Sequence, residues 1–410
     1  MGGVIGGCRS AVRIVLEGRR LRCPAVWVLA ALALATLTIL PRWHFLASAG
    51  DGKSWERRAT DGAGYSETAS AFAQNGIWRT LWGQPFPSLD NWPPVWPFML
   101  FCAQQVSWNE DGGGRLLNLG FAVLTGLLLL AAGERIARGA GVIAALVWAF
   151  APESWPYAAT LESESAGTCL VAATLLACVS RRWMLAGVVA GLAAMTRAAL
   201  FPLVPFVVVA CWVIERSFGA PCLRKAAVVS AVAIALPLAW SVQRSIVNRD
   251  PVWLSADGAR TLAMASAPAN QLGSSQESRL RYRPAARRQL VHLLHHPSWW
   301  LRSSWGRLQM WCSPHAAVGA TWGVVPVWWD TDWLRPVWVL VMIAAAVVAW
   351  RRQSWHLWLI VGAYATYAAG ILAVEGQARF IIPALPMVAL AVGGTVALIC
   401  QRLQQPATAA

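Results

Sequence analysis

Long runs of apolar residues, separated by short polar turns, dominate the chain. Several are shorter than the roughly 20 residues that a straight membrane span needs, so their boundaries are soft. A backbone in hydrocarbon must satisfy its own hydrogen bonds, which makes each run helical. The pattern predicts an all-α polytopic membrane protein with about ten transmembrane helices. The apolar runs cover residues 25–40 and about 116–133, 139–151, 165–180, 183–195, 198–214, 226–243, 336–350, 355–373 and 381–400.

Composition supports this interpretation. Of the 410 residues, 57% are hydrophobic and only 13% charged, whereas soluble domains carry roughly 25% charged residues. The apolar content excludes a soluble globule and also intrinsic disorder. The 26 Trp residues are typical of membrane–water interfaces. A net charge of +15 in such a chain indicates cytoplasmic loops facing anionic lipid and not nucleic acid.

The positions of the basic residues predict the orientation in the membrane. Alternate turns between the apolar runs are rich in arginine, and these turns are expected in the cytoplasm with the basic N-terminus. This alternation holds only if residues 92–108 do not span, so we expect them to form a juxtamembrane helix on the outer face. The arginine-rich turns contain Arg135, Arg138, Arg181, Arg182, Arg216, Arg224, Lys225, Arg351 and Arg352.

The predicted topology divides the chain into six parts and places both termini in the cytoplasm. The first outer segment contains a helix-like stretch at 65–81, and the second a basic helix-like stretch at 279–310. The parts are a cytoplasmic N-terminus and first transmembrane helix (1–41), a first extracytoplasmic loop with juxtamembrane helices (42–114), transmembrane helices 2–7 (115–245), a large extracytoplasmic loop (246–334), transmembrane helices 8–10 (335–401) and a cytoplasmic tail (402–410).

The N-terminal run could be a cleaved signal, because Ala47-Ser48-Ala49 fits a cleavage site. The segment Pro41-Arg42-Trp43-His44 lies between the apolar run and this triplet, and the positive region before the run is long, so we expect an uncleaved anchor. The nine Cys form no CxxC, which favours small buried hydrophobes over disulfides or zinc.

Acidic residues at the predicted outer boundary are the first candidates for chemistry, since a charge near hydrocarbon is costly unless it is paired or hydrated. Asp61 opens Asp61-Gly-Ala-Gly-Tyr65, and Glu162 and Glu164 precede an apolar helix. The alternatives are structural: Asp61 as a helix N-cap, and the glutamates as partners of a helix dipole.

Two arginines reach the same predicted face. Arg197 and Arg379 each follow or precede an apolar run, and an arginine there can bind phosphate. The alternative for each is an interfacial side chain that reaches to water. Outer carboxylates facing outer arginines indicate either a phosphate-bearing lipid substrate or a set of structural ion pairs.

In order along the chain, these residues resemble the GT-C superfamily of membrane glycosyltransferases, in particular the protein-mannosyltransferase and aminoarabinose-transferase branch (glycosyltransferase family 39-like). Their order, spacing and common predicted side carry the resemblance. The motifs are Asp61-x-x-x-Tyr65, Trp92-Pro93-Pro94, Arg115-Leu-Leu-Asn118, Leu161-Glu-Ser-Glu164, Gly191-Leu-Ala-Ala-Met-Thr-Arg197, Asp250-Pro-Val-Trp-Leu-Ser, His296-Pro297-Ser-Trp-Trp-Leu and Arg379-Phe-Ile-Ile-Pro-Ala-Leu-Pro386.

The resemblance implies transfer of a sugar from a polyprenyl-phosphate-linked donor to a glycan, lipid or protein acceptor on the extracytoplasmic face. Asp61 would act as general base on an acceptor hydroxyl in an inverting displacement, or would orient that hydroxyl for the attack. Glu164 would be the second acid, with Glu162 as the alternative. The implied substrate-binding residues are Tyr65, Arg197, Arg379, Trp92 and Pro93, with both arginines on the leaving phosphate.

The chain also departs from this pattern. Trp92 stands where aminoarabinose-type members carry Lys, which argues against that donor, and Gly62 replaces the second acid of a common Asp-Glu pair. We therefore expect no divalent metal and no other cofactor. His292, His295 and His296 could suggest zinc, but the loop lacks matching ligands, so a fold-stabilising role is favoured.

Two other functions stay open. The chain could be a transporter or flippase for a lipid carrier, although it has no inverted repeat, or an inactive scaffold with the same fold. We expect an integral protein of a bacterial inner membrane with its site facing the exterior.

Overall fold

The computed structural model describes most of the predicted spans and part of the segments between them. The description covers residues 24–48, 60–83, 91–107, 110–217, 222–249, 334–374 and 378–404, and the single positions 252, 254, 255, 295, 298, 301, 304, 305 and 308. All of its regular elements are helices. The predicted basic stretch at 279–310 lies outside this description apart from those single positions.

Each of the predicted apolar runs forms a helix. The helices are α2 (Pro24–Ser48), α8 (Glu110–Ile136), α9 (Ala140–Ala149), α10 (Glu164–Val179), α11 (Trp183–Thr196), α12 (Leu203–Ser217), α13 (Cys222–Asn248), α18 (Leu334–Arg352), α19 (Trp355–Val374) and α20 (Leu385–Leu403). Within the described residues, five stretches are long and apolar enough to cross a membrane, and shorter apolar helices accompany them. The chain is an integral membrane protein.

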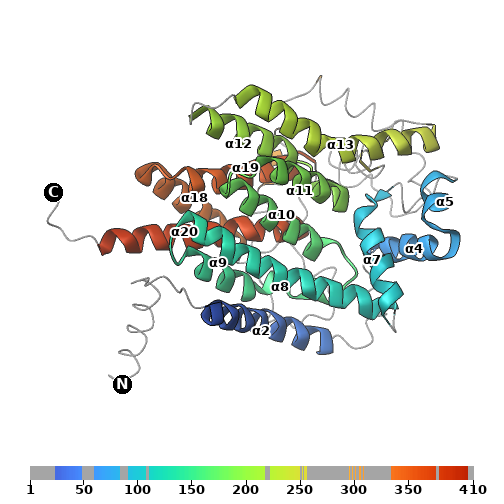
Figure 1. Cartoon of the computed structure of the whole chain (residues 1–410), viewed down its shortest axis with the longest axis horizontal. Coiled ribbons are helices and arrows are strands. Elements are labelled where there is room, and N and C mark those ends of the chain that lie inside the picture. Colours follow the sequence, from blue (N-terminus) through green and yellow to red (C-terminus); the bar gives the residue numbers. More distant parts are fainter. Residues whose placement is uncertain are drawn as a thin grey trace.

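The helices form a bundle around α20, which ends near the C-terminus (Figure 1). The most apolar window of α20 is 83% buried, whereas the corresponding windows of the other four long spans are 33–44% buried. The core is rich in alanine, which lets helix backbones approach closely in a membrane. Large apolar side chains on the outer faces, such as Leu29, Leu340 and Val347, are exposed and suit contact with lipid.

Three further helices lie together at one end of the bundle (Figure 1). They are α4 (Thr60–Asn75), α5 (Ile77–Trp82) and α7 (Val95–Val106), and we call their end of the bundle the α4 end. The predicted helix at 65–81 is divided at Gly76, whose φ of 78° is favoured by glycine. The predicted helix at 92–108 is present as α7, packed against α4 and α8.

The first helix is longer than its apolar run, and a buried arginine lies in the added part. Arg42 is 1% exposed, and its Nη2 donates to Ser154 Oγ at 2.6 Å and to Trp148 O at 3.4 Å. Its guanidinium carbon lies 4.9 Å from the Trp148 ring centroid. The last carbonyls of a helix need donors, and Arg42 supplies them to α9. The helix α2 thus continues beyond the predicted apolar run to Ser48.

The opposite end of the bundle contains the arginine-bearing turns, and we call it the arginine end. There Glu215 of α12 accepts hydrogen bonds from Arg181 (3.0 Å to Nη2), from Trp183 Nε1 (2.7 Å) and from Lys225 Nζ (2.8 Å). The donors come from the α10–α11 turn, the start of α11 and the start of α13. One carboxylate thus joins three consecutive spans.

Candidate active site

A buried ion pair joins the start of α10 to the end of α11 at the α4 end. Glu164 is the first residue of α10, and Arg197 follows the last residue of α11 with extended backbone. Arg197 Nη1 lies 2.6 Å from Glu164 Oε1, and the two side chains are 7% and 0% exposed. Of the sequence-predicted residues, these two are in direct contact.

Tyr65 of α4 extends this cluster. Its hydroxyl lies 3.1 Å from Ser163 Oγ, and the same Ser163 oxygen accepts a hydrogen bond from Arg197 Nη1 at 3.3 Å. Burial raises the pKa of Tyr65, although the nearby positive charge of Arg197 opposes the shift. Tyr65 therefore stays a neutral hydroxyl that can donate. Ser163, which sequence reasoning missed, connects α4 to the ion pair.

Asp61 lies one helical turn before Tyr65, in the first turn of α4. Its side chain is half-buried, and its negative charge acts on the Tyr65 hydroxyl. The N-terminus of a helix favours a carboxylate, so the start of α4 accommodates Asp61. Asp61 is thus beside the buried cluster, but open to solvent.

Glu162 is on the Asp61 side of the cluster. Its side chain is 4% exposed, and a Cβ built on Gly62 would lie 3.8 Å from Glu162 Cγ. The side chain of Glu162 therefore runs beside the first turn of α4. It lies next to Gly62, the position at which the sequence resemblance led us to expect a second acid. The two glutamates diverge: Glu164 contacts Arg197, and Glu162 lies against α4.

Side chains from α7 and α8 hold the loop that carries both glutamates. Asn118 Nδ2 donates to Thr160 O at 2.8 Å and to Glu162 O at 3.2 Å, and Trp96 Nε1 donates to Leu161 O at 2.8 Å. Asn118 belongs to a motif noted in the sequence, whereas Trp96 was missed. A buried indole N–H needs an acceptor, but nothing in the sequence identifies which carbonyl it meets.

Trp92 and Pro93 lie where the chain enters α7. The Trp92 ring packs on Gly64, where an added Cβ would collide with it, and its centroid lies 5.5 Å from that of Tyr65. Pro93 is buried. Trp92 thus packs on the helix that carries Asp61 and Tyr65, and position 64 requires glycine for this close approach.

The beginning of the second outer segment folds back toward the same place. Trp240 Nε1 donates to Leu254 O at 3.1 Å, and Leu254 N donates to Ser241 Oγ at 3.0 Å. Ser255 Oγ then donates to Asn91 O at 2.6 Å, next to Trp92. Part of the sequence motif at 250–255 is therefore fixed on α13 and reaches the start of α7.

Other predicted residues are only partly placed. The backbone of Arg379 lies in a short 3-10 helix (Ala378–Ala384) that packs against α10, but its side chain lies outside the description. His292 and His296 also lie outside the described residues. Across the ranges that the structure describes, no group of three His, Cys, Asp or Glu residues could hold a metal. The expectation of metal-free chemistry stays a prediction.

A tyrosine from a distant span completes the cluster. Tyr367 of α19 is fully buried and interacts electrostatically with Arg197 and Glu164. No sequence signal links a tyrosine in a late apolar run to this ion pair. Both carboxylate oxygens of Glu164 are buried, and neither accepts a hydrogen bond of normal geometry from a described residue, although Oε1 lies 2.6 Å from Arg197 Nη1. The cluster therefore combines a half-buried carboxylate, a neutral hydroxyl and an ion pair with an unused acceptor.

Known proteins match this chain in fold and not in sequence. No protein-family model and no curated protein matches it. The archaeal oligosaccharyltransferase AglB from Archaeoglobus fulgidus, in complex with an inhibitory peptide and a dolichol-phosphate, is similar with a TM-score of 0.54 and 14% identity over 92% of this chain and 50% of that one. The apo form of the Archaeoglobus fulgidus oligosaccharyltransferase matches with a TM-score of 0.51 and 13% identity, over 94% of this chain and 51% of that one.

The same oligosaccharyltransferase tethered to an acceptor peptide with the NVT sequon matches with a TM-score of 0.53 and 14% identity, over 94% of this chain and 50% of that one. At such identities the likeness concerns the fold alone, and this chain spans about half the length of those proteins. The all-α, GT-C-like fold expected from the sequence resemblance is confirmed.

Proposed function

We propose that this chain is a membrane glycosyltransferase that moves a sugar from a polyprenyl-phosphate-linked donor to an acceptor at the α4 end of the bundle. The observation that carries the proposal is the buried Glu164–Arg197 pair (2.6 Å), which meets Tyr65 on the helix that begins with Asp61. The shared fold supports a lipid-linked donor, because one matching oligosaccharyltransferase structure contains a dolichol-phosphate.

In the proposed reaction, Asp61 takes the proton from an acceptor hydroxyl as its oxygen attacks the anomeric carbon. The bond from that carbon to the phosphate oxygen breaks, the electron pair leaves with the phosphate, and the anomeric centre is inverted. Half-burial suits this role for Asp61, because its carboxylate can be reached by the acceptor while it borders the buried cluster.

Arg197 would stabilise the negative charge that grows on the leaving phosphate, which a buried guanidinium does more effectively than an exposed one. Its contact with Glu164 fixes it in place but also balances its charge. A dianionic leaving group therefore calls for a second cation, and we propose Arg379, whose backbone lies against α10. Glu164 would then be a residue that positions Arg197.

Glu162 would be the second carboxylate that acts on the acceptor. The sequence resemblance favoured Glu164 for this role, with Glu162 as the alternative. The contact of Glu162 with the first turn of α4 supports the alternative, because that turn carries the proposed base. Tyr65, Trp92 and Pro93 would line the site, and the acceptor would be a glycan, lipid or protein on the extracytoplasmic side of a bacterial inner membrane.

The test compares Asp61→Asn with Glu67→Gln, an exposed acid on the same helix, in membranes supplied with a panel of polyprenyl-phosphate sugars. Loss of a general base should lower the transfer rate by about 10²- to 10⁴-fold, whereas the control should keep the parent rate. If correctly inserted Asp61→Asn protein transferred sugar at the parent rate, Asp61 would not be the general base. A parent protein that moves the donor across the membrane without transferring sugar would favour a transporter.

A further inference from the structure

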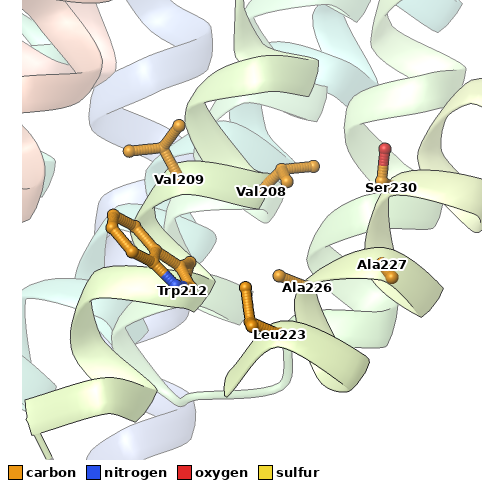
Figure 2. A pocket seen from close by; sticks show the side chains of 7 residues that line it. All are labelled: Val208, Val209, Trp212, Leu223, Ala226, Ala227 and Ser230. Atoms are coloured by element: carbon orange, nitrogen blue, oxygen red, sulfur yellow. The ribbon is translucent and has the colours of Figure 1, made fainter.

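A separate apolar groove opens between α12 and α13 at the arginine end, far along the bundle from the proposed active site. Figure 2 shows its lining, in which the side chains of one helix face those of the other across an open space. The cavity measures about 410 Å³, and Ser230 is its one polar lining residue. The lining consists of Val208, Val209, Trp212, Leu223, Ala226, Ala227 and Ser230.

The groove lies between two candidate spans, 198–217 and 222–248, so in a membrane it would open sideways toward the hydrocarbon. Val209 and Leu223 are 55% and 72% exposed, so large apolar surfaces border it without protein cover. From Leu223 to Ser230 the groove follows α13 for about 10 Å at 1.5 Å per residue. This length and lining suit the upper part of one acyl chain.

Two arginines are close to the lining residues at the arginine end of the groove. The guanidinium carbon of Arg216 lies 5.7 Å from the Trp212 ring centroid, and Arg224 follows the lining residue Leu223. Both side chains are exposed. Among the described residues neither forms an ion pair, whereas their neighbour Lys225 is bound to Glu215. Two positive charges near the groove are therefore not balanced by an ion pair with any described residue.

A phosphate attached to an acyl chain meets both requirements together. Basic pockets between spans attract anionic lipid headgroups, and the apolar lining excludes a free phosphate ion. The basic N-terminal segment of this chain, with Arg9, Arg13 and Arg19, does not match the charge of these two arginines. We propose that this groove binds one anionic glycerophospholipid, with its phosphate between Arg216 and Arg224 and one acyl chain along Trp212 and Ala227.

The test measures which lipids the full-length protein retains when native mass spectrometry releases it from micelles containing equal amounts of phosphatidylglycerol and phosphatidylcholine. The parent should retain phosphatidylglycerol about 30-fold more often, because each of the two basic groups contributes about 1 kcal/mol near a membrane surface. Arg216→Gln/Arg224→Gln should bring the ratio close to one. Arg351→Gln/Arg352→Gln, which removes equal charge from the end of α18, should leave the ratio unchanged.

A second pair of variants tests the groove itself. Ala227→Leu places a larger side chain in the lining and should reduce retention of both lipids, whereas Val228→Leu, on the neighbouring exposed position, should not. Equal retention of the two lipids by the parent would overturn the proposal without any variant. The proposal would also be overturned if both double arginine variants lowered the phosphatidylglycerol preference equally. A lipid-free dimer that Ala227→Leu dissociates would overturn it too, because the groove would then bind a second copy of the chain.

Discussion

Glu164 and Glu215 are both buried carboxylates paired with arginine, but they lie at opposite ends of the bundle and differ in how their oxygens are used. Glu215 Oε1 accepts from Arg181 and Trp183, and its Oε2 accepts from Lys225. Glu164 Oε1 lies 2.6 Å from Arg197 Nη1, but neither buried oxygen of Glu164 accepts a hydrogen bond of normal geometry from a described residue. Buried polar atoms normally have partners.

The comparison distinguishes a structural clamp, the ion-pair cluster at Glu215, from the proposed site at Glu164. The clamp at Glu215 is complete, and its cations are 37% and 40% exposed, so water shares the cost of holding the charges. The pair at Glu164 is more deeply buried and leaves an acceptor unused, which costs free energy unless a bound molecule donates to it. This difference supports the proposal that the Glu164 end of the bundle binds a ligand.

The largest effect is expected from Arg197→Met, because it leaves Glu164 buried without its counter-ion. We expect a loss of about 3–5 kcal/mol in the free energy of unfolding together with loss of sugar transfer. Arg197→Met/Glu164→Met should regain most of the stability but no transfer. Thermal unfolding in detergent and a transfer assay measure both. A double variant as unstable as the single one would contradict the importance of the pair.

Glu162→Gln should lower the rate of sugar transfer by about 10- to 100-fold, which is the effect expected when a hydrogen bond to a charged group is lost. The stability of the protein should not change. The matched control is Glu153→Gln at the same end of the bundle, where Glu153 accepts from Trp338 Nε1 at 2.9 Å. Transfer rates of the two variants, each divided by the amount of folded protein, make the comparison. If Glu164→Gln loses transfer while Glu162→Gln does not, the roles of the two glutamates are reversed.

Glu215→Gln should act on stability alone. The exposed donors Arg181 and Lys225 can return to water, so the expected loss is about 1–2 kcal/mol, less than for the deeply buried pair. Transfer per folded molecule should stay at the parent value. A fall in that value would show that the two ends of the bundle are coupled, against the distinction drawn between clamp and site.

The smallest effect is expected from Tyr65→Phe, which removes the hydroxyl beside Ser163 and should cost about 1 kcal/mol. Because burial raises the pKa of Tyr65, its hydroxyl stays protonated between about pH 6 and 9. The variant should therefore transfer sugar a few-fold more slowly with an unchanged pH–rate profile. Loss of the alkaline limb of that profile would mean that Tyr65 titrates in the working range.

Much of the fold could be predicted because hydropathy is a local property. Apolar runs have to become helices in a membrane, and the helices from α2 to α20 follow them. Two local details could not be predicted. The helix at 65–81 is interrupted at Gly76, which has a positive φ of 78°. The helix α2 continues past its apolar run, where Arg42 donates to the end of α9.

The sequence by itself determined which residues carry charge near the ends of spans, and so nominated Asp61, Glu162, Glu164 and Arg197. Only the tertiary structure decided how these charges combine. Glu162 and Glu164 are two positions apart, yet one lies against α4 and the other against Arg197. Their directions depend on where α10 begins and on how α4 and α11 pack beside it. Spacing along a chain does not contain that information, because pairing energies depend on distances between atoms of separate helices.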